Sequence, residues 1–445
     1  MHNSKNFADA VVFLFIIVIA YTLIKYEACL LWKYQELNLF LNTQLFFKEH
    51  IIIPAGLLAW LGCYLSEFLY YPWIGVMLLC IGWTLIMLIC KKTFSIPNQW
   101  TVTLLIPVAA IVMTIVGAGY WIYYLQQSGY CFTTTIGVIL AMLCVWIFRH
   151  VTPHFLLRAV YVMACTVVTY PLAGFYGLLG TLLIGTTTWR MDDMPLSNKI
   201  IISTIAVLAI IICPLMFCSF VFTQTPAEYA YWAGLPVFYQ DGWLMIYYIP
   251  YFLLVGSLCI MALLGGLKFT VLENHKWLVL TGQIVLMGCL VGGIWSYWYK
   301  DFNFHQELKM QRCMESQDWI GLIKEAGDSK TEPTRAIVMM RNLALFRLGQ
   351  QGDRMYQYRT GNRPYETQLK TPLTRMIGAA LYYHYGQLNY CYRWCMENGL
   401  KTGWRVEHLK YMARSSIANG EKKLARKYLS LLTHTRYHKA WAEKY

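Results

Sequence analysis

Long runs of mostly hydrophobic residues follow one another over the first two thirds of the chain. A helix that spans a bilayer needs roughly 20 mostly apolar residues. Runs of about this length lie near residues 10–31, 72–90, 101–124, 133–149, 155–172, 174–189, 200–222, 244–266 and 277–298. The pattern therefore predicts an all-α, polytopic membrane protein with about nine spanning helices.

Two further apolar stretches, residues 36–49 and 53–70, are interrupted by charged residues and by Pro54. Charged groups are costly at the centre of a bilayer. We therefore expect these stretches to form two interfacial helices that lie along the membrane surface. Together they occupy a first outer loop that covers residues 32–71.

The basic residues of the short loops predict the orientation, because Lys and Arg are retained on the cytoplasmic side. With the N-terminus inside, the inner loops carry basic residues such as Lys91, Lys92 and Arg149. The outer loops at 125–132 and 223–243 carry neither Lys nor Arg. An odd number of crossings then places the C-terminal part outside. In a bacterium this means an inner-membrane protein with a periplasmic C-terminal domain.

From about Asp301 the pattern changes to amphipathic helices with apolar residues at i, i+3, i+4 and i+7, separated by turns that contain Gly. The predicted helices are Phe304–Ala326, Glu332–Gln350, Pro372–Tyr385, Asn389–Asn398, Val406–Asn419 and Lys422–Leu432. Two of them end at Gly386 and Gly420, about one 34-residue tetratricopeptide period apart. The sequence thus divides into a membrane domain, 1–299, and a soluble helical domain, 300–445. The latter resembles tetratricopeptide repeats, although an irregular helical cap remains the alternative.

Composition supports this division. Only 13% of the residues are charged, whereas soluble proteins have about 25%, which excludes an ordinary soluble enzyme and a disordered chain. Residues 300–445 contain 25 Lys and Arg against 13 Asp and Glu, so they hold +12 of the net charge of +14. The 14 Cys show no spacing typical of a metal site or a disulfide framework.

Acidic residues are scarce in the membrane domain, so the position of Glu36 at the outer end of the first span is informative. The pair Gln35-Glu36 is followed by the two surface helices with a break at Pro54-Ala55-Gly56, and then by Pro72 at the second span. This order resembles the C-type (GT-C) superfamily of polyprenyl-phosphate-dependent membrane glycosyltransferases. The chain also resembles uncharacterised bacterial multi-pass membrane proteins, which suggest no activity.

The resemblance implies an enzyme that moves a sugar from a polyprenyl-linked donor to an acceptor on the outer face of the membrane. A tetratricopeptide-like tail also occurs in that superfamily, and here it would bind a protein or peptide acceptor. The sequence departs from the pattern at two places. Many members have Asp or Asp-Glu where this chain has Gln35-Glu36, and their Lys-Pro-Pro stretch is replaced by Ile53-Pro54-Ala55-Gly56.

Transfer to a hydroxyl or amide acceptor needs a base or a metal-holding group at the membrane surface. Our hypothesis is that Glu36 deprotonates or orients the acceptor, while Gln35 and Asn38 hydrogen-bond to sugar hydroxyls. The alternative is that Glu36 is a solvated residue at headgroup level that ends the first helix.

Two other groups of residues complete the candidate site. Tyr239, Gln240 and Asp241 in the loop 223–243 offer an aromatic and acidic surface for a sugar, or else an interfacial aromatic belt. For a carrier phosphate the outer face offers Lys33, Lys48 and, just past the last span, Lys300 with His305. Lys300 is the preferred cation, with the tail arginines in reserve, unless Lys300 only reaches along the membrane surface. Whether a cofactor is needed stays open, although convergence of Glu36 and Asp241 would favour Mg²⁺ or Mn²⁺.

Competing functions make different demands on the chain. A non-enzymatic scaffold, whose repeat tail binds a protein partner in envelope assembly or secretion, explains the tail but gives Glu36 no role. A transporter is disfavoured because charges inside the predicted spans are nearly absent. The basic tail has no nucleic-acid motif, so we expect no nucleic-acid partner, and anionic membrane lipid is a simpler one.

Overall fold

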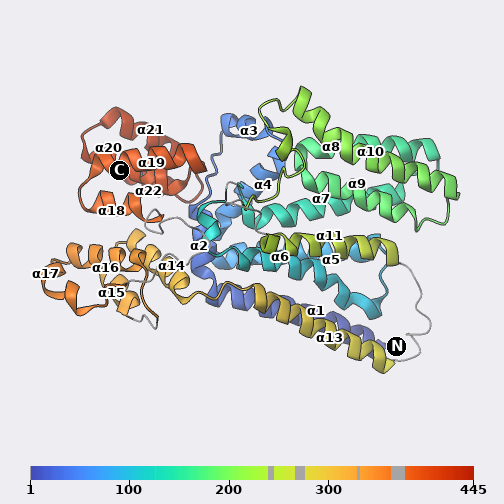
Figure 1. Cartoon of the computed structure of the whole chain (residues 1–445), viewed down its shortest axis with the longest axis horizontal. Helices are drawn as coiled ribbons and strands as arrows, with labels where there is room; N and C mark the ends of the chain where they lie inside the picture. The colour runs from blue at the N-terminus through green and yellow to red at the C-terminus, as the bar shows by residue number, and fades with distance from the viewer. Residues whose placement is uncertain (1, 126, 239–244, 266–275, 328–330, 362–375) are drawn as a thin grey trace.

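The computed structural model describes residues 2–125, 127–238, 245–265, 276–327, 331–361 and 376–445. The described residues form helices and connecting segments, and none of them lies in a strand. Figure 1 shows the membrane helices as one bundle with the C-terminal helices gathered at one end of it. The N-terminus lies at the opposite end of the bundle. The predicted all-α fold is therefore confirmed.

Seven helices among the described residues are long and apolar enough to cross a membrane. They are α1 (His2–Tyr26), α5 (Pro72–Thr93), η2 with α6 (Asn98–Leu104 and Leu105–Gly117), α7 (Tyr130–His150), α8 (Phe155–Ala173), α10 (Leu196–Phe220) and α13 (Lys276–Tyr297). Two shorter apolar helices, α9 (Phe175–Thr188) and α11 (Ile249–Leu264), lie at the other two positions predicted as spans. Each predicted span thus corresponds to a helix, and seven of the helices have full spanning length.

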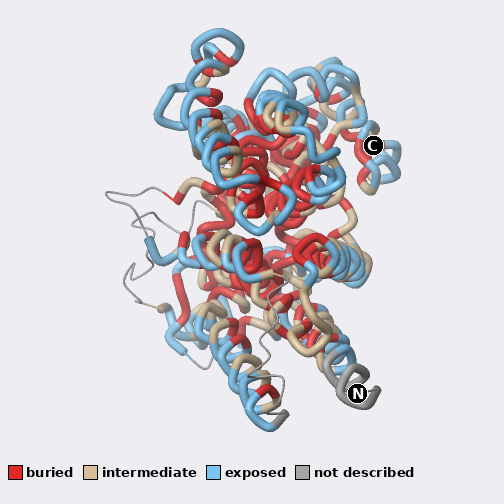
Figure 2. Tube along the Cα trace, turned by 90° about the vertical axis from the view of Figure 1, so that its right-hand side faces the viewer, coloured by how far each residue is buried: buried red, intermediate tan, exposed pale blue. Residues whose placement is uncertain are grey.

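The outward surface of the bundle is apolar. Figure 2 shows exposed positions along the outer faces of its helices and buried positions in its interior. Large apolar side chains such as Phe13 on α1, Leu156 on α8 and Trp277 on α13 are exposed, as expected for helices whose surroundings are lipid. The central helix α6 is instead buried at nearly every position, so the bundle packs around it.

The first predicted span, 10–31, does not continue unbroken. Glu27 adopts φ −111° and ψ 14°, so α1 ends at Tyr26 and α2 (Ala28–Glu36) begins after it. The Glu27 side chain is buried and accepts a hydrogen bond from Trp298 Nε1 at 2.6 Å. The break thus lies at a buried polar side chain whose hydrogen-bond partner is far away in the sequence. The hydrophobicity of the stretch alone does not predict such a break.

The loop between α2 and α5 also differs from its prediction. Instead of one helix over 36–49, residues 37–43 are not helical and Thr43 caps the short helix α3 (Gln44–Ile51), accepting a hydrogen bond from the Phe46 amide. The predicted helix over 53–70 is divided into α4 (Gly56–Ser66) and η1 (Glu67–Tyr70). Helix α3 and the turn after it expose Leu45, Ile52 and Ile53, which agrees with an interfacial position.

The tail is made of short helices packed in sequence. The predicted helix Phe304–Ala326 is two helices, because Gln317 takes a positive φ of 58° between them. Four other predicted helices each match one helix of the structure, namely those at 332–350, 389–398, 406–419 and 422–432. Part of the predicted helix 372–385 lies outside the described residues. The tail helices are α14 (Phe302–Glu315), α15 (Trp319–Gly327), α16 (Arg335–Arg347), α17 (Gln351–Arg354), η6 (Met355–Gln357), α18 (Gly378–His384), α19 (Leu388–Thr402), α20 (Val406–Ala418), α21 (Lys422–Thr433) and α22 (Lys439–Lys444).

The tail is fastened to the loop between α2 and α5 by contacts far apart in the sequence. Tyr437 stacks on Tyr70 with ring centroids 5.0 Å apart, and the Arg436 guanidinium lies over the Phe68 ring at 4.5 Å. Arg405 donates a hydrogen bond to the Tyr123 carbonyl oxygen at 2.6 Å, in the segment η3 (Gly119–Tyr123) that follows α6. The tail therefore forms a fixed cap on one end of the bundle.

Candidate functional site

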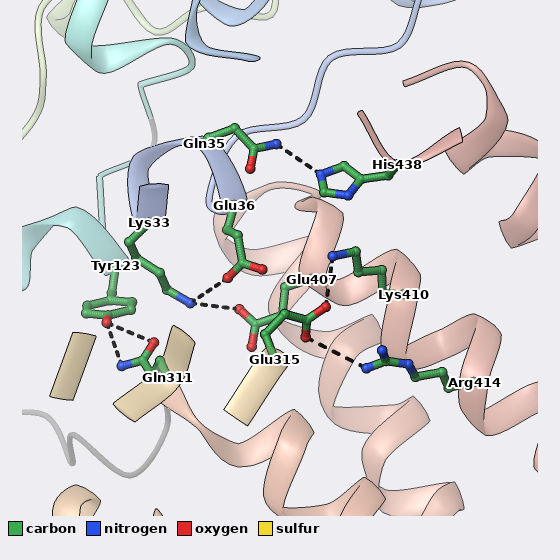
Figure 3. A network of polar contacts seen from close by, with 10 residues as sticks. All are labelled: Lys33, Gln35, Glu36, Tyr123, Gln311, Glu315, Glu407, Lys410, Arg414 and His438. Carbon is green, nitrogen blue, oxygen red and sulfur yellow. Dashed lines mark hydrogen bonds and ion pairs between the residues drawn. The ribbon is translucent and has the colours of Figure 1, made fainter. Parts of the chain in front are cut away.

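Helix α2 lies between the bundle and the tail, and its two faces have different surroundings. Lys33 and Glu36 point toward the tail helices, as Figure 3 shows. Tyr34, Leu37 and Asn38 instead line a cavity between the first loop and the tail. The sequence-predicted residues Gln35, Glu36 and Asn38 are all buried. They are therefore divided between an ion-pair network and a cavity.

The network centres on Lys33, which is only 1% exposed. Its Nζ lies 3.2 Å from Glu36 Oε2 on the same helix and 3.3 Å from Glu407 Oε2 on α20 of the tail. A buried charge is tolerated only when it is paired. Lys33 therefore joins the first loop to the tail.

A second set of pairs continues the network into the tail. Glu315 on α14 accepts from Lys410 Nζ at 2.9 Å, and its other oxygen is 3.7 Å from Arg414 Nη1. Tyr123 and Gln311 are hydrogen-bonded across the same interface. The main network thus contains three carboxylates and three cations and has no net charge when all are ionised (Figure 3).

Gln35 contacts a different part of the tail. Its amide Nε2 lies 3.0 Å from His438 Nε2, and an amide nitrogen can only donate. Burial lowers the pKa of His438 to about 3, so the ring is neutral and accepts this hydrogen bond. Of the predicted pair, Gln35 therefore contacts the tail directly, whereas Glu36 is linked to it through Lys33.

Burial also changes the protonation of the carboxyl groups at this interface. It raises the pKa of Glu36 from about 4.5 to about 7, against the opposing effect of Lys33. It raises the pKa of Glu67 on η1 to about 7 as well. The folded protein thus retains protons on these groups in a range where the unfolded chain has released them.

This shift predicts a pH dependence of stability. Between about pH 4.5 and about pH 7 the folded state holds more protons on Glu36 and Glu67 than the unfolded state does, so the stabilisation that these two groups contribute is lost as pH rises through this range. Three buried tail histidines with lowered pKa values act in the opposite direction. We expect the stability of Glu36→Gln to fall less, or rise more, with pH than that of the wild type, and the difference between the two proteins is the contribution of Glu36. The midpoint of thermal unfolding in mild detergent, followed across this range, measures it. Glu397→Gln, in an exposed pair on α19, should leave the slope unchanged, and an unaltered slope in Glu36→Gln would contradict the assignment.

The cavity on the other face of α2 has a volume of about 370 Å³, which suits a small ligand. Elements from three parts of the chain line it, namely α2 with α3, the turn before α7, and the tail. Its polar lining includes Asn38, Glu49, His50, Ser66, Gln127, Ser128 and Thr402, and its aromatic lining includes Tyr34, Tyr130, Trp404 and Tyr428.

Asn38 holds one wall of this cavity together. Its Nδ2 donates to the Cys63 carbonyl oxygen at 3.1 Å, and its Oδ1 accepts from the Gly129 amide at 3.2 Å. Gly129 has φ +68°, and a Cβ there would lie 2.2 Å from the Gly62 carbonyl carbon. Only glycine permits this close approach of the turn to α4. Asn38 thus lies at the cavity but positions the backbone around it.

Other lining groups are available to a ligand. Gln127 donates through Nε2 to the Gly234 carbonyl oxygen, which leaves its buried Oε1 without a hydrogen-bond partner. His50 Nδ1 lies 2.9 Å from the Phe46 carbonyl oxygen. Since a carbonyl only accepts, Nδ1 carries the proton and the neutral ring presents the Nε2 lone pair. The carboxylate of Glu49 is exposed beside it.

The remaining predicted site residues lie elsewhere. The Lys300 ammonium is over the Trp295 ring at 4.4 Å, and His305 contacts Glu27; neither lines the cavity. Tyr239, Gln240 and Asp241 are outside the described residues. The structure thus brings Gln35 and Glu36 to the tail interface and Asn38 to the cavity, and it separates Lys300 and His305 from them.

A divalent cation does not fit the surroundings of Glu36. The Lys33 ammonium occupies the position beside its Oε2 that a metal ion would take. Over the part of the chain that the structure describes, there is no group of three or more His, Cys, Asp or Glu side chains that could hold a metal. We therefore assign no step to Mg²⁺ or Mn²⁺.

Sequence reasoning did not select Glu49 and His50. The available signal was an adjacent acid and histidine on a stretch already predicted to lie at the membrane surface. Trp404 and Thr402 had no such signal, because they reach the cavity only when the tail folds back over the first loop.

Comparison with protein families finds a match over nearly the whole chain. A family of unknown function, DUF6057, matches residues 4–445. No curated protein matches the chain, and no solved structure does so.

Proposed function

The chain belongs to this family of unknown function, and we propose that it is a membrane-embedded transferase that moves a sugar from a lipid-linked carrier to an acceptor bound at the cavity. The observation that carries the proposal is the cavity itself. It combines amide, hydroxyl, carboxylate and imidazole groups with the rings of Phe, Tyr and Trp side chains at the boundary between bundle and tail. Aromatic faces and convergent polar groups together suit a sugar ring.

The lining residues suggest how transfer would proceed. His50 Nε2 takes the proton from the acceptor hydroxyl or amide as that atom bonds to the anomeric carbon of the sugar. As this bond forms, the bond from the same carbon to the carrier phosphate oxygen breaks, and the phosphate leaves with the electron pair. Glu49 stabilises the protonated imidazole, and Gln127 Oε1 accepts a hydrogen bond from a sugar hydroxyl.

A lipid-linked carrier is supported by the position of α3. This helix contributes Phe46, Glu49 and His50 to the cavity while Leu45, Ile52 and Ile53 of the same segment are exposed. A headgroup held in the cavity would thus have its hydrocarbon chain beside an apolar surface. Within this proposal Lys401, an exposed residue next to the lining residue Thr402, supplies a cation for the carrier phosphate.

The catalytic role predicted for Glu36 changes within this proposal. Its carboxylate is 3% exposed, pairs with Lys33 and does not line the cavity. We propose that Glu36 and Gln35 fix the tail, which in turn supplies Trp404 and Thr402. The tail then acts as a tetratricopeptide-like domain on the periplasmic side of the inner membrane, where it closes the cavity and presents a protein or peptide acceptor.

The test is the pool of lipid-linked sugar in cells that lack the protein. We expect this pool to accumulate in a deletion strain and to return to its normal level with the wild-type chain. Thr402→Trp, which fills the cavity, should fail to restore it. Thr433→Trp is a matched control, because both threonines end a helix with the hydroxyl bonded back to the helix, and Thr433 does not line the cavity. An unchanged pool in the deletion strain, or full restoration by Thr402→Trp, would refute the proposal.

A membrane-anchored scaffold is the second candidate. It is favoured by large apolar side chains exposed on the tail, including Ile320, Tyr356 and Leu400, since such residues suit a protein partner. In the same strain, restoration of growth by Thr402→Trp but not by Ile320→Asp or Leu400→Asp would favour the scaffold over the enzyme.

A further inference from the structure

A separate polar contact joins the tail to the bundle at the break between α1 and α2. Glu27 there is 1% exposed. Its Oε1 accepts a hydrogen bond from Trp298 Nε1 at 2.6 Å and lies 3.0 Å from His305 Nε2 on α14. His305 was predicted to bind a carrier phosphate, but its ring instead faces this carboxylate.

The other nitrogen of the same ring also faces an oxygen. His305 Nδ1 lies 2.9 Å from the Asp301 carbonyl oxygen, which can only accept. A neutral imidazole has a single N–H. It can therefore satisfy Asp301 or Glu27, but in each case its second nitrogen would direct a lone pair at an oxygen. Both contacts are hydrogen bonds only when the ring carries two protons or the Glu27 carboxyl carries one.

The surroundings favour the protonated pair. The acidic side chains near the ring are Glu27, in the break, and Asp301, which caps α14. The cations on the adjoining elements are directed elsewhere: Lys300 to the Trp295 ring and Lys309 to Glu325 on α15, while Arg312 lies beside Cys29 on α2. Burial lowers the pKa of His305, but Glu27 and Asp301 together outweigh it, so that this pKa is raised above 6.5.

Loss of the proton would leave a costly arrangement. The Glu27 carboxylate would remain buried with Trp298 as its remaining neutral donor, because its second oxygen, Oε2, has no hydrogen-bond partner. An unpaired buried charge is strongly unfavourable. Since α14 is the first helix of the tail, separation of His305 from Glu27 would loosen the tail where it leaves the last membrane helix.

We propose that Glu27 and His305 together bind one proton, and that this proton fastens α14 of the tail to the bundle. The stabilisation is complete below the ordinary imidazole pKa and is lost as pH rises through the higher value of the folded protein. The site is independent of the cavity and of any transfer reaction. It makes the attachment of the tail sensitive to the pH on the tail side of the membrane.

Hydrogen exchange of the full-length protein in lipid nanodiscs tests this proposal. The protection of residues 302–315, corrected for intrinsic exchange rates, is compared at about pH 6 and about pH 9. We expect wild-type protection to fall with pH, by up to about tenfold for each unit by which the His305 pKa is raised. His305→Gln cannot titrate at this position, so its protection should fall less between the two values, and the fall that remains comes from other groups such as Glu36.

Two further variants make the outcome decisive. His434→Gln, at an exposed histidine of the tail, should keep the wild-type pH dependence. Glu27→Gln, which keeps the shape but removes the carboxylate, should shift the fall to lower pH. A wild-type protection that does not depend on pH, or the full wild-type dependence retained in His305→Gln, would overturn the proposal. A general loss of folding in one variant would instead lower protection throughout the bundle at both pH values, and the other two variants would then decide.

Discussion

Lys33→Met should destabilise the folded protein by about 3–5 kcal/mol, because removal of one partner from a buried ion pair leaves an uncompensated charge. Lys33 forms salt bridges with both Glu36 and Glu407, and the second of these joins α2 to the tail. Met matches its length and apolar stem, so the change removes the ammonium with little effect on packing. The shift in the thermal unfolding midpoint in mild detergent measures the loss, and limited proteolysis of the tail shows where it occurs.

The charge of Lys33, rather than its volume, is the expected cause. A triple variant with Lys33→Met, Glu36→Gln and Glu407→Gln should therefore recover much of the lost stability, since it leaves no buried carboxylate without a cation. Lys422→Met, at an exposed lysine of α21, is the matched control and should change stability by less than about 0.5 kcal/mol. Wild-type stability in Lys33→Met would mean that the network contributes nothing to tail attachment.

The hydrophobic pattern was sufficient to predict the fold class, because the apolar positions of a helix depend on whether lipid, protein or water surrounds it. A run of apolar residues requires a nonpolar environment whatever the rest of the chain does, and each predicted span corresponds to a helix. The amphipathic period likewise located most tail helices, such as α20 at Val406–Ala418. The number of spans, the periplasmic side and the tetratricopeptide-like character of the tail stay predictions.

The hydrophobic pattern did not predict where a helix breaks at a buried polar residue. Glu27 interrupts an otherwise apolar stretch and turns toward Trp298 and His305, which follow it by more than 270 residues. No local signal marks such a partner. The same limit explains the short non-helical segment before α3, where Thr43 begins a helix that hydrophobicity placed several residues earlier.

The candidate site shows the same limit for function. Scarcity of acids drew attention to Glu36, and its position at the end of the first helical region is confirmed. Its surroundings could not be predicted, because Glu407 and Lys410 reach the interface through folding of the tail. A carboxylate expected to meet solvent or substrate is thus paired inside the protein, and its catalytic role remains a hypothesis. Other residues of the first loop, such as Asn38, Glu49 and His50, line the cavity instead.

Among these groups, His50 should carry the largest effect on activity. If its Nε2 is the base, His50→Gln removes proton transfer and should slow turnover of the lipid-linked sugar by about 10²–10⁴-fold. The substitution should leave stability nearly unchanged, because His50 is only partly buried near the end of α3 and its Nδ1 bonds to the Phe46 carbonyl oxygen of the same helix. A chase of the labelled lipid-linked pool in membranes from the complemented deletion strain measures the rate.

Substitutions at neighbouring residues of α3 show whether His50 acts as the base or whether any change in this helix slows turnover. Lys48→Gln alters an exposed side chain that does not line the cavity, so turnover should equal that of the wild type. Glu49→Gln should slow turnover less than His50→Gln, because Glu49 stabilises the imidazolium but does not itself take the proton. The reverse order would make Glu49 the base, whereas wild-type turnover in both variants would remove α3 from the chemistry and leave the cavity as a binding site alone.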